Sequence, residues 1–78
     1  MAMLELFGTA RCPHTHEMRD WLELRRREFV EYDVEIDSVA RARMHTIAKG
    51  QRNVPLLVED GRIVQVGWQG RSCVVEAD

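Results

Sequence analysis

Residues 4–15 read LELFGTARCPHT, and this stretch contains the transition that decides the fold. The apolar run at 4–7 is typical of a short strand, and Gly8 favours a loop after it. Pro13 suits the first position of a helix, where the N–H that proline lacks would have no partner. The pattern therefore predicts that Cys12 lies between a strand and the amino end of a helix.

The hydrophobic period changes repeatedly along the rest of the chain. Alternation over residues 30–36 predicts a strand with one buried face, and an Asp60-Gly61 pair between two apolar runs predicts a hairpin. The expected elements after the first strand are a helix from Pro13 to about Arg27, a strand over 30–36, a helix capped by Ser38 and ended by Gly50, and hairpin strands over 56–58 and 63–66.

This order predicts an α/β fold of the form β-α-β-α-β-β. A helical crossover makes the first two strands parallel, and the hairpin adds an antiparallel pair, so the sheet is mixed and four-stranded. Neither a repeat nor a linker divides the chain, and residues 1–78 are expected to form a single domain. Open α/β sheets place working groups at the carboxyl edge of their strands, which is where Cys12 falls.

Composition excludes several partners. The formal charge of −2 supplies no field for nucleic acid or an anionic membrane, and no apolar run approaches the ~20 residues that cross a bilayer. Nothing near Met1 resembles a targeting signal, so we expect a cytoplasmic protein. Two cysteines are too few for a disulfide scaffold, which leaves buried, metal-binding or redox-active thiols.

Cys12 is predicted to be a nucleophile. Unpaired N–H groups and the positive end of the helix dipole lower the pKa of a thiol below the ~8.5 of free cysteine. Arg11 and His14 add positive charge, and the Thr15 hydroxyl can donate a hydrogen bond to the sulfur. The alternative is a small buried cysteine. Residues two apart on a helix point to different faces, so His14 does not converge with Cys12 and at most His16 does, and no closed metal site is predicted.

The chain resembles the glutaredoxin branch of the thioredoxin fold. The resemblance rests on Cys12-Pro13-His14-Thr15 between a strand and a helix, and on residues 50–55, GQRNVP, before a hairpin. It implies a cis Pro55 facing the reactive sulfur. The motif is also similar to that of short bacterial glutaredoxin-like proteins in which selenocysteine can replace the residue at Cys12.

The resemblance also implies a glutathione site. The backbone of Val54 can pair with an extended thiol peptide, and Gln51 and Arg52 are candidates for its carboxylate, with Arg11 close to the sulfur. The alternative for Gln51 and Arg52 is that they lie in a solvated loop and have no binding role. The expected partners are glutathione or a similar low-molecular-weight thiol, and a disulfide or glutathionylated protein; no other cofactor is required.

The carboxyl end departs from the family pattern. Glutaredoxins have a diglycine, an acidic residue and a long final helix, whereas residues 67–73 read GWQGRSC, so we expect a truncated or missing C-terminal helix. Trp68 resembles a tryptophan of short glutaredoxin-like electron donors that are reduced by thioredoxin reductase. This resemblance makes Trp68 a candidate binding residue and thioredoxin reductase a candidate partner. Cys73 lies near the place of a second cysteine in some single-thiol glutaredoxins, and is either a resolving thiol or a buried structural residue.

We therefore predict a thiol–disulfide oxidoreductase with a monothiol mechanism through Cys12, resolved by glutathione, a similar thiol or Cys73. Two alternatives stay open. A single-thiol relative can share a 2Fe–2S cluster between two subunits, although Pro13 stands where cluster carriers usually have glycine. A non-catalytic binding module could use Cys12 as a sensor of oxidation.

Overall fold

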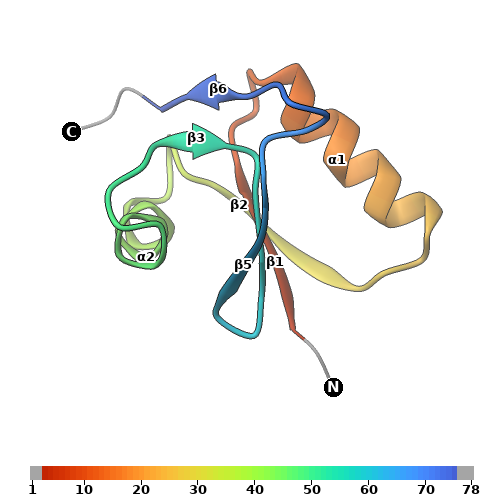
Figure 1. Cartoon of the computed structure of the whole chain (residues 1–78), viewed down its shortest axis with the longest axis horizontal. Coiled ribbons are helices and arrows are strands. Elements are labelled where there is room, and N and C mark those ends of the chain that lie inside the picture. Colours follow the sequence, from red (N-terminus) through yellow and green to blue (C-terminus); the bar gives the residue numbers. More distant parts are fainter. Residues whose placement is uncertain (1–2, 76–78) are drawn as a thin grey trace.

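The computed structural model describes residues 3–75, and Figure 1 shows a central sheet between two helices. The elements are β1 (Leu4–Gly8), α1 (Pro13–Leu24), β2 (Phe29–Asp33), α2 (Ser38–Ile47), β3 (Asn53–Val54), β4 (Leu56–Glu59), β5 (Arg62–Val66) and β6 (Cys73–Val74). No helix in the described part of the chain is long and apolar enough to cross a membrane.

The main sheet is mixed and four-stranded, as predicted. Its strand order is β2-β1-β4-β5, with β1 parallel to β2 and antiparallel to β4, and β4 antiparallel to β5. The β4–β5 turn holds Asp60 and Gly61 at φ 52° and 82°, the left-handed conformation that a tight two-residue hairpin requires. The hairpin prediction is therefore confirmed.

β1 is buried along its whole length because it is a central strand with a helix on each face. Side chains of β1 alternate between two clusters. Leu4 and Leu6 pack with Met18 and Leu22 of α1, whereas Phe7 packs on the other face with the α2 side. The α2 cluster also contains Cys12, so the reactive loop is anchored in the core.

A buried carboxylate interrupts the apolar face of β1. Glu5 is 3% exposed, and Arg43 of α2 donates to both of its oxygens at 2.5 and 3.0 Å, with the Tyr32 hydroxyl at 3.1 Å. The hydrogen bonds from Arg43 hold the pKa of Glu5 below its ordinary value, although burial acts in the opposite direction. This pair joins α2 to the centre of the sheet.

Three sequence expectations were wrong in detail. The cap of α2 is Asp37, whose carboxylate accepts from the Ala40 N–H at 3.0 Å, and Ser38 is already helical. The strand expected over 30–36 ends at Asp33, so Ile36 lies beyond it in a turn, where its N–H donates to the Asp33 carbonyl and its side chain is 83% exposed. α1 ends at Leu24, short of Arg27.

A second, two-stranded ladder lies beside the main sheet and was not predicted. β3 and β6 pair antiparallel, Asn53 with Val74 and Val54 with Cys73, and they lie side by side in Figure 1. Between β5 and β6, residues 67–72 form a turn, so the described chain has no helix after β5, in agreement with the expected truncation. Residues 76–78 lie outside the described residues.

Candidate functional site

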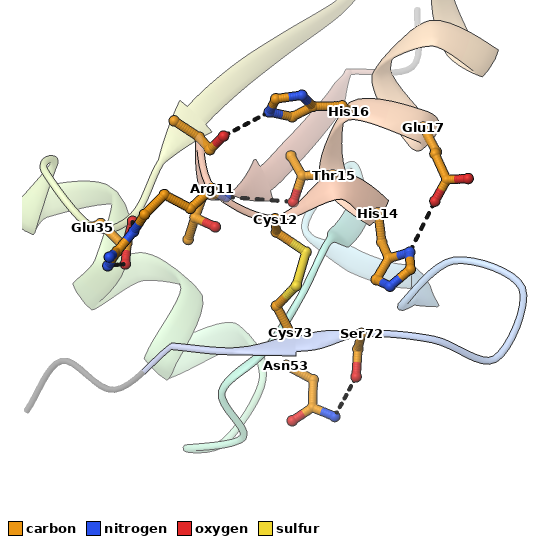
Figure 2. The surroundings of a disulfide bond; sticks show 12 residues. Arg11, Cys12, His14, Thr15, His16, Glu17, Glu35, Asn53, Ser72 and Cys73 are labelled. Atoms are coloured by element: carbon orange, nitrogen blue, oxygen red, sulfur yellow. Dashed lines mark hydrogen bonds and ion pairs between the residues drawn. A yellow bond between two sulfur atoms is a disulfide. The ribbon is translucent and has the colours of Figure 1, made fainter.

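A disulfide between Cys12 and Cys73 is the centre of the candidate site (Figure 2). Cys12 is the N-cap residue of α1, and Cys73 is the first residue of β6, 61 positions later in the sequence. Their Cα atoms are 6.0 Å apart, within the ~7 Å that a disulfide allows. The structure thus places beside Cys12 a second thiol that the active loop itself lacks.

The turn that returns the chain to Cys12 depends on glycine. Gly67 has φ 78°, and a Cβ there would lie 2.7 Å from the Arg71 carbonyl oxygen. Its N–H donates to the Pro55 carbonyl at 2.7 Å. Trp68 and Arg71 then exchange backbone hydrogen bonds at 2.7 and 2.9 Å. These contacts direct the following residues along β3 and bring Cys73 to Cys12.

The amino end of α1 favours negative charge at Cys12. No side chain caps the helix, and its first turn contains no acidic residue. Pro13 has no N–H and the Thr15 N–H donates to the Cys12 carbonyl at 3.1 Å, so the positive end of the helix dipole is the main feature that favours a thiolate. Cys12 is only 1% exposed in the disulfide form. A substrate can therefore reach its sulfur only after the Cys73 side chain moves.

Thr15 is buried beneath the active loop. Its hydroxyl accepts from the Thr9 N–H at 3.4 Å, and its methyl group packs against Gly8 so closely that a Cβ on that glycine would lie 2.3 Å away. This contact fixes the distance between the end of β1 and the first turn of α1, on either side of the active loop. The predicted hydrogen bond from Thr15 to the sulfur stays a prediction, because an accepting hydroxyl still has its own proton to donate.

The two histidines of the first turn have different partners. His14 bonds to the Glu17 carboxylate through Nδ1 at 2.9 Å, which holds its ring along the helix (Figure 2). His16 bonds through Nε2 to the Ala10 carbonyl at 2.8 Å, so it ties α1 back to the loop before Cys12. Sequence reasoning missed this positioning role, since nothing in the spacing links His16 with Ala10.

Arg11 extends from the active loop to Glu35. Its guanidinium donates to the carboxylate at 2.6 Å, as Figure 2 shows. This hydrogen bond lowers the pKa of Glu35 from its ordinary value. The charged group of Arg11 is thus held at Glu35, on the loop after β2.

Of the predicted thiol-peptide residues, Val54 lies in β3, and Gln51 and Arg52 directly precede this strand. Val54 is fully buried, the Val54–Pro55 peptide bond is cis as the resemblance implied, and Cys73 pairs with Val54. Gln51 uses its amide locally, accepting from the Asn53 N–H at 2.9 Å and donating to the Asn53 carbonyl at 3.2 Å. The Arg52 side chain is exposed, and its carbonyl accepts from the Val75 N–H at 2.9 Å.

Trp68 lies against α1, where its ring packs on Trp21 at a centroid distance of 5.6 Å. This contact anchors the turn that precedes β6. Asn53 and Ser72 were not singled out from the sequence, yet the Asn53 amide donates to the Ser72 hydroxyl at 3.0 Å across the ladder. No local signal could have revealed that pair, because the two residues are 19 positions apart.

No group of three or more His, Cys, Asp or Glu side chains is arranged to hold a metal ion within residues 3–75. The 2Fe–2S alternative requires a free Cys12 thiolate. In this structure the Cys12 sulfur is bonded to Cys73 instead.

Similar structures share this architecture. The thioredoxin-like protein BC3987 matches with a TM-score of 0.74 and 27% identity, over 85% of this chain and 88% of that chain. A point mutant of the same protein matches equally well over 82% of its chain. Glutaredoxin 1 from Francisella tularensis, solved with cacodylate, matches with a TM-score of 0.60 over 87% and 85% of the two chains. At 18% identity, this last match shows the fold alone.

Comparison with the curated proteins found no match. The glutaredoxin family model, however, matches residues 4–64, which include β1, the active loop, both helices, the cis proline and most of the hairpin. This fold and family support a role in thiol–disulfide redox chemistry. The chain belongs to the glutaredoxin family.

Proposed function

We propose that this chain is a thiol–disulfide oxidoreductase in which Cys12 attacks the substrate and Cys73 resolves the intermediate. The observation that carries the proposal is the Cys12–Cys73 disulfide at the amino end of α1, beside the cis peptide bond before Pro55. The active loop contributes one thiol, and the second comes from a strand that folds over it.

The first step is attack by the reduced Cys12 thiolate on a disulfide of the substrate. A bond forms between Cys12 Sγ and one substrate sulfur, the substrate disulfide breaks, and the other substrate sulfur leaves as a thiolate that takes up a proton from solvent. The amino end of α1 favours the attacking thiolate. Substrates of this kind include protein disulfides and glutathionylated protein thiols.

The second step is attack by Cys73 on Cys12 Sγ. The Cys12–Cys73 bond forms, the mixed disulfide breaks, and the remaining substrate sulfur leaves as a thiol after protonation. The substrate gains two electrons and the protein loses two. Two molecules of a low-molecular-weight thiol such as glutathione then return the protein to its dithiol form, and a reductase of the thioredoxin reductase type is a second source of those electrons.

The test compares wild type, Cys12→Ser and Cys73→Ser in the reduction of a glutathionylated peptide and of a protein disulfide, with mass spectrometry of the trapped protein. Cys12→Ser should be inactive on both substrates. Cys73→Ser should accumulate a mixed disulfide on Cys12 and reduce the protein disulfide slowly.

Two results would contradict the proposal. Turnover by Cys12→Ser at the wild-type rate would remove Cys12 as the nucleophile. Turnover of both substrates by Cys73→Ser at the wild-type rate, with no trapped intermediate, would assign resolution to glutathione alone. A reducing location such as the cytoplasm, where these thiols are supplied, is part of the proposal.

A further inference from the structure

The backbone edge at Asn53–Val54 is occupied by the chain's own segment 72–75. Cys73 pairs with Val54, and its sulfur is bonded to Cys12. Any other extended peptide that places a cysteine sulfur on Cys12 and pairs with Val54 must therefore take the position of Cys73. The segment 72–75 shows which features such a peptide needs.

The contacts of the segment alternate along its length. The Ser72 hydroxyl accepts from the Asn53 amide at 3.0 Å, and the Val75 N–H donates to the Arg52 carbonyl at 2.9 Å. Val74 points outward and is 63% exposed, as the period of a strand requires. The segment is thus held on both sides of Cys73 by contacts other than the disulfide, one through the Ser72 side chain and one through the Val75 backbone.

Val75 is the apolar anchor of the segment. Its side chain is 3% exposed and belongs to the core cluster that contains Met44, Ala48 and Val54. Burial of a valine side chain contributes roughly 1.5 kcal/mol, which corresponds to about tenfold in an equilibrium constant. The site therefore has a place for an apolar side chain two residues after the cysteine.

We propose that this surface docks a protein segment in extended conformation with the pattern cysteine, any residue, apolar residue, and that Ser72–Val75 is an internal copy of that segment. The proposal rests on the proposed function, because it names the class of protein substrate that Cys12 takes. Glutathione supplies the cysteine, but only one residue follows it, so it cannot fill the Val75 position.

In the oxidised chain the Cys73 side chain must first move aside, because Cys12 is only 1% exposed in the disulfide form, and an incoming segment then displaces its internal copy by exchange. The thiolate of the segment attacks Cys12 Sγ, a new mixed disulfide forms, and the Cys12–Cys73 bond breaks. Cys73 leaves as a thiolate and takes up the proton that the incoming thiol released. One disulfide replaces another, so no oxidant or reductant is consumed.

The test measures exchange equilibria at Cys12 in the full-length Cys73→Ser variant, with glutathione as the reference thiol. The probe is acetyl-RSCVV-amide, copied from residues 71–75. RSCVS changes the buried position, and RSCSV is the matched control that changes the exposed one. Residues 72–75 of the variant still compete for the edge, but they affect all three peptides equally.

RSCVV and RSCSV should form the mixed disulfide equally well, and RSCVS should be about tenfold weaker. Equal constants for all three peptides, or a larger loss for RSCSV than for RSCVS, would overturn the proposal. The measurement needs no catalytic turnover. If Cys12 exchanges selectively with RSCVV but the protein turns over no substrate, only the proposed enzymatic function is rejected. If the protein turns over substrates but exchanges equally with all three peptides, only the docking pattern is rejected.

Discussion

Gly8 and Thr15 are packed so closely that a Cβ on Gly8 would lie 2.3 Å from Thr15 Cγ2 and 2.6 Å from its hydroxyl oxygen. Gly8 ends β1, and Thr15 is in the first turn of α1. The contact therefore fixes the spacing between the strand and the helix on either side of Cys12. Neither partner can move away easily, because Thr15 is 1% exposed.

Gly8→Ala should lower the free energy of unfolding by about 1–3 kcal/mol, since overpacking a buried site costs that amount. Thr15→Ala removes both clashing atoms, so the Gly8→Ala change should cost less in a Thr15→Ala background. Chemical denaturation of wild type, the two single variants and the double variant gives the coupling free energy between the two positions. Purely additive effects would show that the two residues do not share this contact.

Gly67→Ala should weaken the Cys12–Cys73 disulfide relative to glutathione. Gly67 and Gly70 both have positive φ, at 78° and 79°, but only a Cβ at Gly67 meets a backbone atom, the Arg71 oxygen. Gly70→Ala is thus a matched control for the strain of the left-handed conformation. We expect an additional cost of about 1–2 kcal/mol for Gly67→Ala, or five- to thirtyfold in the thiol–disulfide equilibrium.

That equilibrium is measured in glutathione redox buffers, with alkylation and mass spectrometry to count free thiols. Equal shifts for the two alanine variants would mean that the Gly67 contact does not position Cys73.

The reduced Cys12 thiol should have a pKa below the ~8.5 of a free cysteine, because the amino end of α1 stabilises the thiolate. The measurement is the pH dependence of alkylation in Cys73→Ser, where Cys12 is the single thiol. Cys12→Ser is the control, since Cys73 lies on a strand without a helix dipole. Alkylation of both thiols with the same midpoint would contradict the activation of Cys12.

Glu5→Gln should destabilise the fold by about 1–3 kcal/mol at neutral pH, because it removes a buried carboxylate that accepts charge-assisted hydrogen bonds. The pKa of Glu5 is lower in the folded chain, with the Arg43 hydrogen bonds as the main cause. Its contribution is therefore complete above the ordinary value of 4.5 and is lost as the pH falls through the folded-state pKa.

Denaturation curves between neutral and acidic pH check this prediction, with the exposed Glu23→Gln as control. The difference between wild type and Glu5→Gln should shrink in acid. A difference that stays constant down to the acid limit would show that the Glu5 charge does not contribute.

Local signals in the sequence determined most of the elements. Pro13 marks the start of α1, the Asp60-Gly61 pair marks the β4–β5 turn, and Gly50 follows α2 with φ 89°. Each signal depends on the backbone preferences of one or two residues, so it can be read without knowledge of the fold. The placement of Cys12 between a strand and a helix follows from the same local signals.

Tertiary structure decided which faces are buried and which thiols meet. Val30 and Ile36 continue an apolar alternation, yet they are 42% and 83% exposed, because β2 is an edge strand that ends early. The two-residue strands β3 and β6 are too short to show a period. Their pairing depends on contacts among residues distant in sequence.

The sequence by itself thus determined the order of the two helices and the four main-sheet strands, and the single thiol of the active loop. Only the folded chain decided that Cys73 is bonded to Cys12 and that segment 72–75 covers the Val54 edge. The physical reason is the separation along the sequence over which each effect acts. Propensity and period act over a few residues, whereas the approach of Cys73 to Cys12 closes a separation of 61 positions through the Gly67 turn and the burial of Val75.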